Sequence, residues 1–272
     1  MSLITNSELT VLDLVPFGQG NSAQIFALRL SPPPWQDYMP GQFVMLRPRN
    51  WGLDLPWARP FSISRASERD LVCLFQIVGR GTARLAQLKP GDAVRVWGPL
   101  GNGFAVQPDT PTLLLAGGMG IAPFIGYVQK HPKPWNLSMI FGHRAPLGSY
   151  PVDSFNERVD VEAIQESNPE ELAAFVSLLE KRMYDCGAQK GLALACGPLP
   201  FLRTVQRIAA DSGLRTQLSL EKRMACGVGA CLGCVVNTTE EWPLPEKKKQ
   251  PVQSCTHGPV FWSTHIELEE RA

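Results

Sequence analysis

Four cysteines near the end of the chain have a spacing that can hold an iron–sulfur cluster. Cys226, Cys231 and Cys234 follow the pattern C-x4-C-x2-C, and Cys255 follows after 20 further residues. Four thiolates at this spacing hold a 2Fe-2S cluster. Glycines between and beside the cysteines suit a loop that wraps around a cluster, because its backbone needs unusual angles and its amides must point at sulfur. We therefore expect these four cysteines to be the ligands of a 2Fe-2S cluster.

Two other uses of the cysteines remain open. A structural zinc site usually has two C-x2-C knuckles, and this motif contains one. Disulfides are typical of secreted proteins, whereas residues 1–12 are polar and lack the basic and apolar regions of a signal peptide. The ligand spacing favours iron and sulfide over both alternatives.

Length and composition exclude some classes of protein. A chain of 272 residues predicts about two domains, and a formal net charge of +1 has no electrostatic footprint for nucleic acid. The longest apolar run, around 112–128, is rich in glycine and too short to span a bilayer. Seven cysteines, four of them in one motif, fit a reducing compartment. We expect a cytoplasmic protein that binds neither nucleic acid nor membrane.

The first hundred residues read as short strands separated by turns such as Pro40-Gly41 and Pro90-Gly91-Asp92. Alternation of apolar and polar residues predicts six strands, at 8–14, 23–30, 42–46, 61–64, 71–78 and 93–97. One short helix is expected over 82–88. Six strands in so short a stretch indicate a small antiparallel barrel.

Two stretches of this barrel region could hold a ligand. In Arg59-Pro60-Phe61-Ser62, a cation, a ring and a hydroxyl follow one another along a strand. In Gly79-Arg-Gly81-Thr82, a glycine turn opens the predicted helix and exposes amides that favour an anion. Either stretch taken by itself is commonplace in proteins without such a site.

From residue 112 the pattern becomes that of an α/β domain with a parallel sheet. The apolar run 112–116 leads into a glycine turn with Gly117, Gly118 and Gly120, where missing side chains would let a nucleotide approach the backbone. Further strands are expected at 137–141, 192–196 and 216–220. One helix is expected to begin at 168–171 with Asn168 as its cap, and another to begin at Pro200 and end at Gly213. Two apolar stripes are predicted to pack into the core: Leu172, Phe175, Val176, Leu179 and Met183 in the first helix, and Phe201, Val205, Ile208 and Ala209 in the second.

The stretches Arg59-Pro60-Phe61-Ser62 and Gly79-Arg-Gly81-Thr82 resemble motifs of the ferredoxin reductase superfamily. The stretch from Gly98 to Gly103 is also similar to that superfamily's pattern. The resemblance implies that Arg59 pairs with the pyrophosphate of FAD, and that Pro60 and Phe61 lie beside the flavin. It implies that Ser62 bonds near the flavin N5 and that Gly81 and Thr82 lie at the pyrophosphate. Cys196, in a Cys-Gly-Pro motif, would lie at the nicotinamide end of the nucleotide site, and Ser62 and Cys196 are therefore the expected catalytic residues.

The chain departs from the superfamily at 159–167, where many relatives carry threonine and serine residues that hold the nucleotide. No basic pair stands out to take a 2′-phosphate, so NAD is favoured over NADP. Cys196 could also be a buried apolar cysteine with no chemical role.

Over nearly its whole length the chain resembles the electron-transfer subunits of two-component, NAD-linked dihydroorotate dehydrogenases. The resemblance implies an FAD-binding barrel at 1–104, a Rossmann-like NAD-binding α/β domain at 105–218 and a plant-type 2Fe-2S segment at 219–272. It also implies a flavoprotein catalytic subunit as partner in a hetero-oligomer, which would carry the dihydroorotate chemistry of pyrimidine biosynthesis. We call the loop that carries Cys226, Cys231 and Cys234 the cluster loop. We expect the partner to contact this loop near Met224, Val228 and Leu232. The lysines 247–249 are expected in an exposed loop, with a role at a partner surface as the alternative.

Two other functions remain open. Diaphorase-type subunits of hydrogenases, sulfide dehydrogenases and bifurcating reductases share the flavin, nucleotide and cluster motifs, and differ in their partner. A zinc-stabilised binding module with a degenerate reductase fold would contain zinc and would not oxidise NADH.

Overall fold

The computed structural model describes residues 4–18, 24–35, 37–155, 158–243 and 249–268. Its N-terminal part is a curled, seven-stranded antiparallel sheet with the strand order β4-β3-β7-β1-β2-β6-β5. The strands are β1 (Thr5–Phe17), β2 (Ile25–Leu30), β3 (Phe43–Pro48), β4 (Arg59–Ser62), β5 (Arg65–Ala66), β6 (Leu71–Gln76) and β7 (Ala93–Leu100), and the helix is α1 (Arg80–Leu85). The predicted antiparallel barrel is confirmed.

The long strand β1 curls this sheet. Its first half pairs with β7 and its second half with β2, and the register shifts between Val11 and Asp13. A bulge of this kind bends a strand and increases its twist. The curl brings β4 towards β6, where the rings of Phe61 and Phe75 lie 5.9 Å apart between centroids. The apolar face of the curled sheet encloses the hydrophobic core of this N-terminal part.

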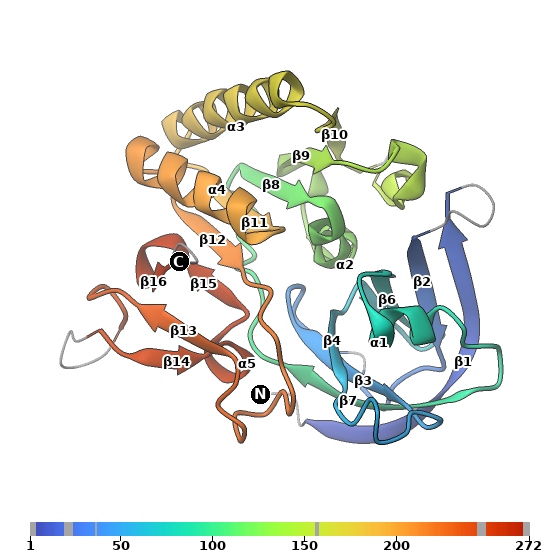
Figure 1. Cartoon of the computed structure of the whole chain (residues 1–272). Coiled ribbons are helices and arrows are strands. Elements are labelled where there is room, and N and C mark those ends of the chain that lie inside the picture. The colour runs from blue at the N-terminus through green and yellow to red at the C-terminus, as the bar shows by residue number, and fades with distance from the viewer. Residues whose placement is uncertain (1–3, 19–23, 36, 156–157, 244–248, 269–272) are drawn as a thin grey trace.

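The middle of the chain forms a six-stranded sheet with the order β10-β9-β8-β11-β12-β15. Its strands are β8 (Thr112–Gly117), β9 (Leu137–His143), β10 (Asp160–Gln165), β11 (Leu192–Cys196), β12 (Thr216–Ser219) and β15 (Val260–Trp262), of which only β15 runs antiparallel to its neighbour. Helix α2 (Ala122–Lys130) covers one face, while α3 (Pro169–Ala188) and α4 (Leu199–Ser212) cover the other (Figure 1). This layering confirms the predicted α/β part.

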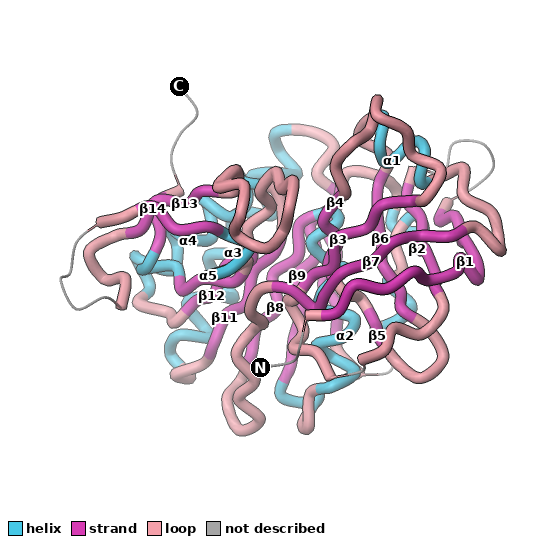
Figure 2. The backbone as a smooth tube through the Cα atoms, turned by 90° about the horizontal axis from the view of Figure 1, so that it is seen from below, coloured by secondary structure: helices cyan, strands magenta, loops and turns pink. Residues whose placement is uncertain are grey.

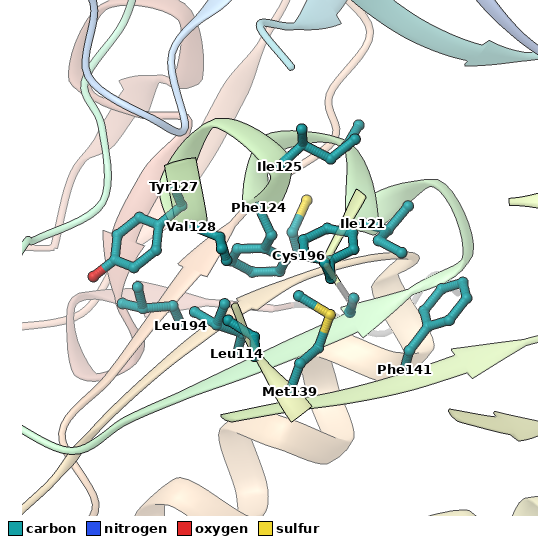
Figure 3. Close-up of a cluster of buried hydrophobic side chains, with 14 of the residues drawn as sticks. Leu114, Ile121, Phe124, Ile125, Tyr127, Val128, Met139, Phe141, Leu194 and Cys196 are labelled. Atoms are coloured by element: carbon teal, nitrogen blue, oxygen red, sulfur yellow. The ribbon is translucent and has the colours of Figure 1, made fainter. Parts of the chain in front are cut away.

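Alternate side chains of β8 explain why both faces of the sheet are covered. Leu114 packs in one core with α2, and Leu113 and Leu115 pack in the other with α3 and α4. Figure 3 shows the first of these cores, in which Phe124 of α2 lies over Leu114 and Leu194. Strands buried on both faces read as continuous apolar runs, which is what the sequence has here.

The predicted helix ends are present. Asn168 Oδ1 accepts a hydrogen bond from the Glu171 amide at 2.8 Å and caps α3, and Gly213 ends α4 in the left-handed region with φ 65°. The prediction that Leu172 of α3 packs into the core is wrong, because this residue is 45% exposed. Phe201 of α4 is half-buried and stacks on Phe175, with their ring centroids 6.0 Å apart.

The C-terminal part contains a three-stranded sheet and a short helix. The elements are β13 (Val235–Thr238), β14 (Pro251–Gln253), α5 (Ser254–His257) and β16 (Ile266–Glu267). Figure 2 shows β13 and β14 at one end of the molecule and the barrel strands β1 and β2 at the other, with β8, β9, β11 and β12 between them. Because β15 pairs with β12, this part is joined to the parallel sheet. The domain boundaries at 104 and 218 stay predictions.

None of the helices in the described residues is long and apolar enough to cross a membrane. Lysines 247 and 248 lie outside the described residues, whereas Lys249 Nζ makes an ion pair with Glu267 at 2.6 Å and its side chain is exposed.

Candidate functional site

The loop that carries the first three motif cysteines lies against the barrel. The indole nitrogen Nε1 of Trp97, in β7, donates a hydrogen bond of 2.9 Å to the carbonyl of Cys226. Gly227 has φ +73°, and a Cβ there would lie 2.6 Å from the Met45 side chain. Gly229 has φ +85° and would meet Thr256 at 2.9 Å. Glycine is required at both positions by the backbone angle and by the close contact.

The four motif cysteines form two pairs. Cys226 Sγ and Cys231 Sγ lie 3.4 Å apart, and Cys226 Sγ accepts hydrogen bonds from the amides of Val228 and Cys231. In the second pair, the amide of Cys255 donates to Cys234 Sγ at 3.4 Å. Among the described residues, no group of three or more His, Cys, Asp or Glu side chains is arranged around a single ion. Two thiolate pairs with amide donors fit a 2Fe-2S cluster, in which each iron takes two protein ligands.

The two pairs differ in exposure. Cys234 and Cys255 are buried, Cys226 is half-buried and Cys231 is exposed. The pKa of the Cys231 thiol is lowered to about 7, chiefly by a hydrogen bond with the backbone of Cys226. Burial raises the pKa of the Cys255 thiol to about 12. The outer pair therefore faces the surface, where Leu232 is 60% exposed with φ 53°, a backbone angle that is uncommon for a leucine.

A large cavity lies where the barrel, the α/β part and the cluster segment meet. It has a volume of about 1220 Å³, more than the roughly 300–1,000 Å³ usual for one small-molecule site. Eight of the predicted flavin, nucleotide and catalytic residues line it: Arg59, Pro60, Phe61, Ser62, Thr82, Gly117, Gly118 and Cys196. The volume leaves room for two ligands side by side.

Arg59 is held in place with donors left over. Its Nη1 donates to the carbonyls of Trp57 at 2.8 Å and Ala58 at 3.2 Å, and its guanidinium carbon lies 5.5 Å from the ring centroid of Trp51. A Cβ on Gly81 would lie 2.8 Å from Arg59 Nε, so only glycine lets the guanidinium approach α1 this closely. No carboxylate of the described residues pairs with Arg59 through a salt bridge. An arginine of this kind in a cavity suits a phosphate.

Thr82 lines the cavity, and its hydroxyl is engaged within the turn that opens α1. Its Oγ1 accepts hydrogen bonds from the amides of Val78 at 2.9 Å and Gly79 at 3.2 Å and donates to the carbonyl of Gly79 at 3.1 Å. The hydroxyl therefore holds the glycine turn together.

The glycine turn after β8 meets the turn after β11. A Cβ on Gly120 would overlap the carbonyl oxygen of Cys196, and one on Gly117 would press on Pro198 and Phe201 at 3.1 and 3.2 Å. Gly118 has φ +53° and open space around it. The chain continues from β8 towards β10 on one side and from β11 towards β12 on the other, so these turns flank the switch point of the sheet. Nucleotides bind at this point in open α/β sheets.

Cys196 and Glu221 lie together on the cavity wall. Burial raises the pKa of the Cys196 thiol, and the charge of Glu221 raises it further. Desolvation by the surrounding protein also raises the pKa of Glu221, whose side chain is exposed to the cavity. Cys196 is therefore a neutral thiol at pH 7, which suits contact with a ring better than nucleophilic attack. Glu221 has no predicted role, although it opens the stretch that leads to the first cluster cysteine.

The far end of the cavity lies at the carboxyl ends of β9 and β10. Glu166 follows β10, and a Cβ on Gly142 would overlap its carboxylate oxygen. Burial raises the pKa of Glu166, and the charge of Arg144 opposes this. Leu172 lines the same end, which explains its exposure. Strand β10 and Glu166 were missed because the run Asp-Val-Glu-Ala-Ile-Gln is mixed in polarity, as is usual at a sheet edge.

Comparisons with known proteins agree with this geometry. A family model described as the iron-sulfur cluster binding domain of dihydroorotate dehydrogenase B matches residues 221–267. Among solved structures, one described as the NADH-dependent reduced ferredoxin-NADP oxidoreductase, from work on flavin-based electron bifurcation, is similar with a TM-score of 0.77 at 21% identity, covering 96% of this chain and 90% of that one. Ferredoxin-NADP+ reductase from Plasmodium falciparum is similar with a TM-score of 0.62 at 16% identity, covering 75% and 88%. These likenesses confirm the predicted fold.

Full-length relatives show the family. The dihydroorotate dehydrogenase B (NAD(+)), electron transfer subunit, of Caldanaerobacter subterraneus subsp. tengcongensis is 32% identical over 227 residues, which cover 84% of this chain and 86% of that protein. The protein of the same name from Desulforamulus reducens is 33% identical over 237 residues, which cover 85% and 87%. With such identity along most of both sequences, the chain belongs to the family of dihydroorotate dehydrogenase B (NAD(+)) electron transfer subunits.

Proposed function

We propose that this protein passes electrons between NAD(H) and a partner flavoprotein, the catalytic subunit of a dihydroorotate dehydrogenase, in pyrimidine biosynthesis. One observation carries the proposal: the cavity reaches the cluster loop. Phe43 and Met224 line the cavity. Both also pack in the small apolar core that contains Cys234 and Cys255. A bound flavin and a bound iron–sulfur cluster would thus be separated by little more than these side chains.

The proposed cofactors are FAD, NAD and a 2Fe-2S cluster. FAD exchanges two electrons with a nicotinamide as hydride and single electrons with a cluster, so it has to stand between them. Arg59 and the Gly81 turn would hold the pyrophosphate, Pro60 and Phe61 would lie along the flavin, and Ser62 and Cys196 would contact the reacting rings. Gly117 and Gly118 would admit the nicotinamide nucleotide, and Gly120 would let the turn approach the Cys196 carbonyl. We place the protein in the cytoplasm, where reduced cysteines persist.

The nucleotide preference gives a first prediction. Glu166 stands at the end of β10, where a carboxylate can accept bonds from the 2′-hydroxyl of NAD and repels the 2′-phosphate of NADP. We expect Glu166→Gln to raise kcat/KM for NADPH relative to NADH about 10-fold, since one repulsive charge pair is removed. The measurement is NAD(P)H oxidation with an artificial dye.

Glu162→Gln is the matched control, because this carboxylate lies on β10, just before Glu166, but makes an ion pair with Arg182 at 2.8 Å. An unchanged nucleotide ratio in Glu166→Gln would contradict the assignment of Glu166.

The partner surface gives a second prediction. Val228 and Leu232 are exposed beside the outer cysteine pair, whereas Met224 is half-buried and packs inward. We expect Leu232→Asp to reduce turnover with the catalytic subunit at least about 10-fold, because a charge in an apolar contact is left desolvated. NADH oxidation with a dye should remain unchanged.

Leu147→Asp serves as the control, because Leu147 is an exposed leucine in the α/β part. If Leu232→Asp retains full turnover with the partner, the cluster loop is not the docking surface.

The experiment that tests the function is co-purification followed by assay. The protein should co-purify with a flavoprotein that oxidises dihydroorotate, and only the complex should reduce NAD+ with dihydroorotate. Co-purification with a hydrogenase or another reductase subunit would instead support a diaphorase-type function. A protein that binds zinc and takes up neither flavin nor iron after anaerobic reconstitution would contradict both.

A further inference from the structure

Two large apolar residues remain exposed at the barrel end of the cavity. Trp57 is 58% exposed and Val78 is 80% exposed, and both line the cavity. Trp57 precedes β4 and Val78 precedes α1, so they approach the cavity from different segments. An indole left uncovered inside a cavity is unfavourable in water and is typical of a ligand contact.

The position of Trp57 is tied to that of Arg59. Its carbonyl accepts the 2.8 Å hydrogen bond from Arg59 Nη1. The loop before it is tied to α1 by an ion pair of 2.7 Å between Arg84 Nη2 and Asp54 Oδ2. A ligand that accepts hydrogen bonds from the remaining donors of Arg59 would therefore lie next to Trp57 and close to α1.

The strand β4 gives the site a direction. Ser62 pairs with Phe43, which packs against Cys234 and Cys255, whereas Arg59 pairs with Leu46 at the other end of the strand. The rise of about 3.3 Å per residue separates these two ends by roughly 10 Å. With the flavin ring at Ser62 and the pyrophosphate at Arg59, the rest of a dinucleotide extends beyond Arg59, towards Trp57 and Val78.

We propose that Trp57 stacks on the adenine of FAD, that Val78 borders the adenine, and that this contact makes the site prefer FAD to FMN. The inference rests on the proposed FAD site at Arg59. Adenine is a flat π-system, and an indole offers it a large aromatic face that needs no particular hydrogen-bond pattern. FMN ends at its phosphate and has nothing to place there.

The test compares FAD and FMN binding to the full chain after its flavin has been removed and its cluster retained. Quenching of flavin fluorescence measures both affinities in the wild type, Trp57→Ala and Trp57→Phe. We expect Trp57→Ala to weaken FAD binding about 5- to 150-fold, the range found when an aromatic platform for a base is removed. FMN binding should change less than about twofold, and Trp57→Phe should restore most of the FAD affinity.

Trp135→Ala is the control, because Trp135 is 73% exposed and lines a separate hollow. Unchanged FAD binding in Trp57→Ala, or an equal loss of FAD and FMN, would overturn the stacking role while the flavin site stands. A wild-type chain that binds neither flavin would overturn the flavin site and, with it, this inference.

Discussion

Replacing Cys231 by serine should remove the iron–sulfur cluster and leave flavin binding intact. Cys231 belongs to the outer cysteine pair, and a hydroxyl is a far poorer iron ligand than the thiol whose pKa is lowered to about 7. With a single protein ligand left on the outer iron, we expect iron content to fall below roughly a tenth of the wild-type value. Cys231 is exposed and does not line the flavin cavity, so FAD binding should stay within about twofold.

Iron analysis and flavin absorbance of the same sample measure both effects. Cys186→Ala is the control, since Cys186 is a buried cysteine of α3 outside the motif and should leave the iron content unchanged. Equal loss of iron and flavin from Cys231→Ser, with the fold shown intact by circular dichroism, would contradict the separation of the two sites.

Arg59→Ala should have the opposite effect, with loss of flavin and retention of iron. Charge-assisted hydrogen bonds contribute about 1.5–3 kcal/mol each, so loss of a bidentate contact to the pyrophosphate should weaken FAD binding at least about 100-fold. Arg59→Lys keeps the charge but not the fork of donors, and should recover only part of the affinity.

Arg49→Ala is the matched control in the same barrel, because Arg49 is exposed and makes an ion pair with Glu8 at 3.2 Å. FAD affinity is measured by titration of the flavin-free protein. If Arg59→Ala binds FAD as tightly as Arg49→Ala does, the pyrophosphate lies elsewhere in the cavity.

The two variants together separate the sites. Loss of iron only from one and of flavin only from the other is expected because the cysteines and Arg59 lie on different segments, joined through Phe43 and Met224. Turnover with the partner subunit should be lost in both, since electrons have to pass through both sites.

Local features of the chain could be predicted well from its sequence. Strand β11 (Leu192–Cys196) has the predicted bounds, and the Asn168 cap and the Gly213 end of α4 are where they were expected. These features depend on neighbours a few residues apart, through side-chain alternation, capping bonds and the backbone freedom of glycine. The family resemblance, which rested on short motifs in a fixed order, is likewise confirmed.

Features that depend on distant segments were not predicted. Leu172 was assigned to the core by helical spacing, but the cavity removes the neighbour that would have covered it. Glu166, Glu221 and Trp57 carried no local signal, because their surroundings come from elements far apart in the chain. The pairing of β15 with β12, which ties the segment after Cys255 to the parallel sheet, is non-local in the same way.

The four cysteines show where the division falls. Their spacing by itself predicts the ligand set, because C-x4-C-x2-C followed by a distant fourth cysteine is the arrangement of thiolates that holds a 2Fe-2S cluster. Only the tertiary structure decided which pair faces the surface, since burial of Cys234 and Cys255 depends on Phe43, Met45 and Leu100 of the barrel. It also decided that the cavity meets the buried pair, because packing of the cluster segment against the barrel brings Met224 and Phe43 to one wall.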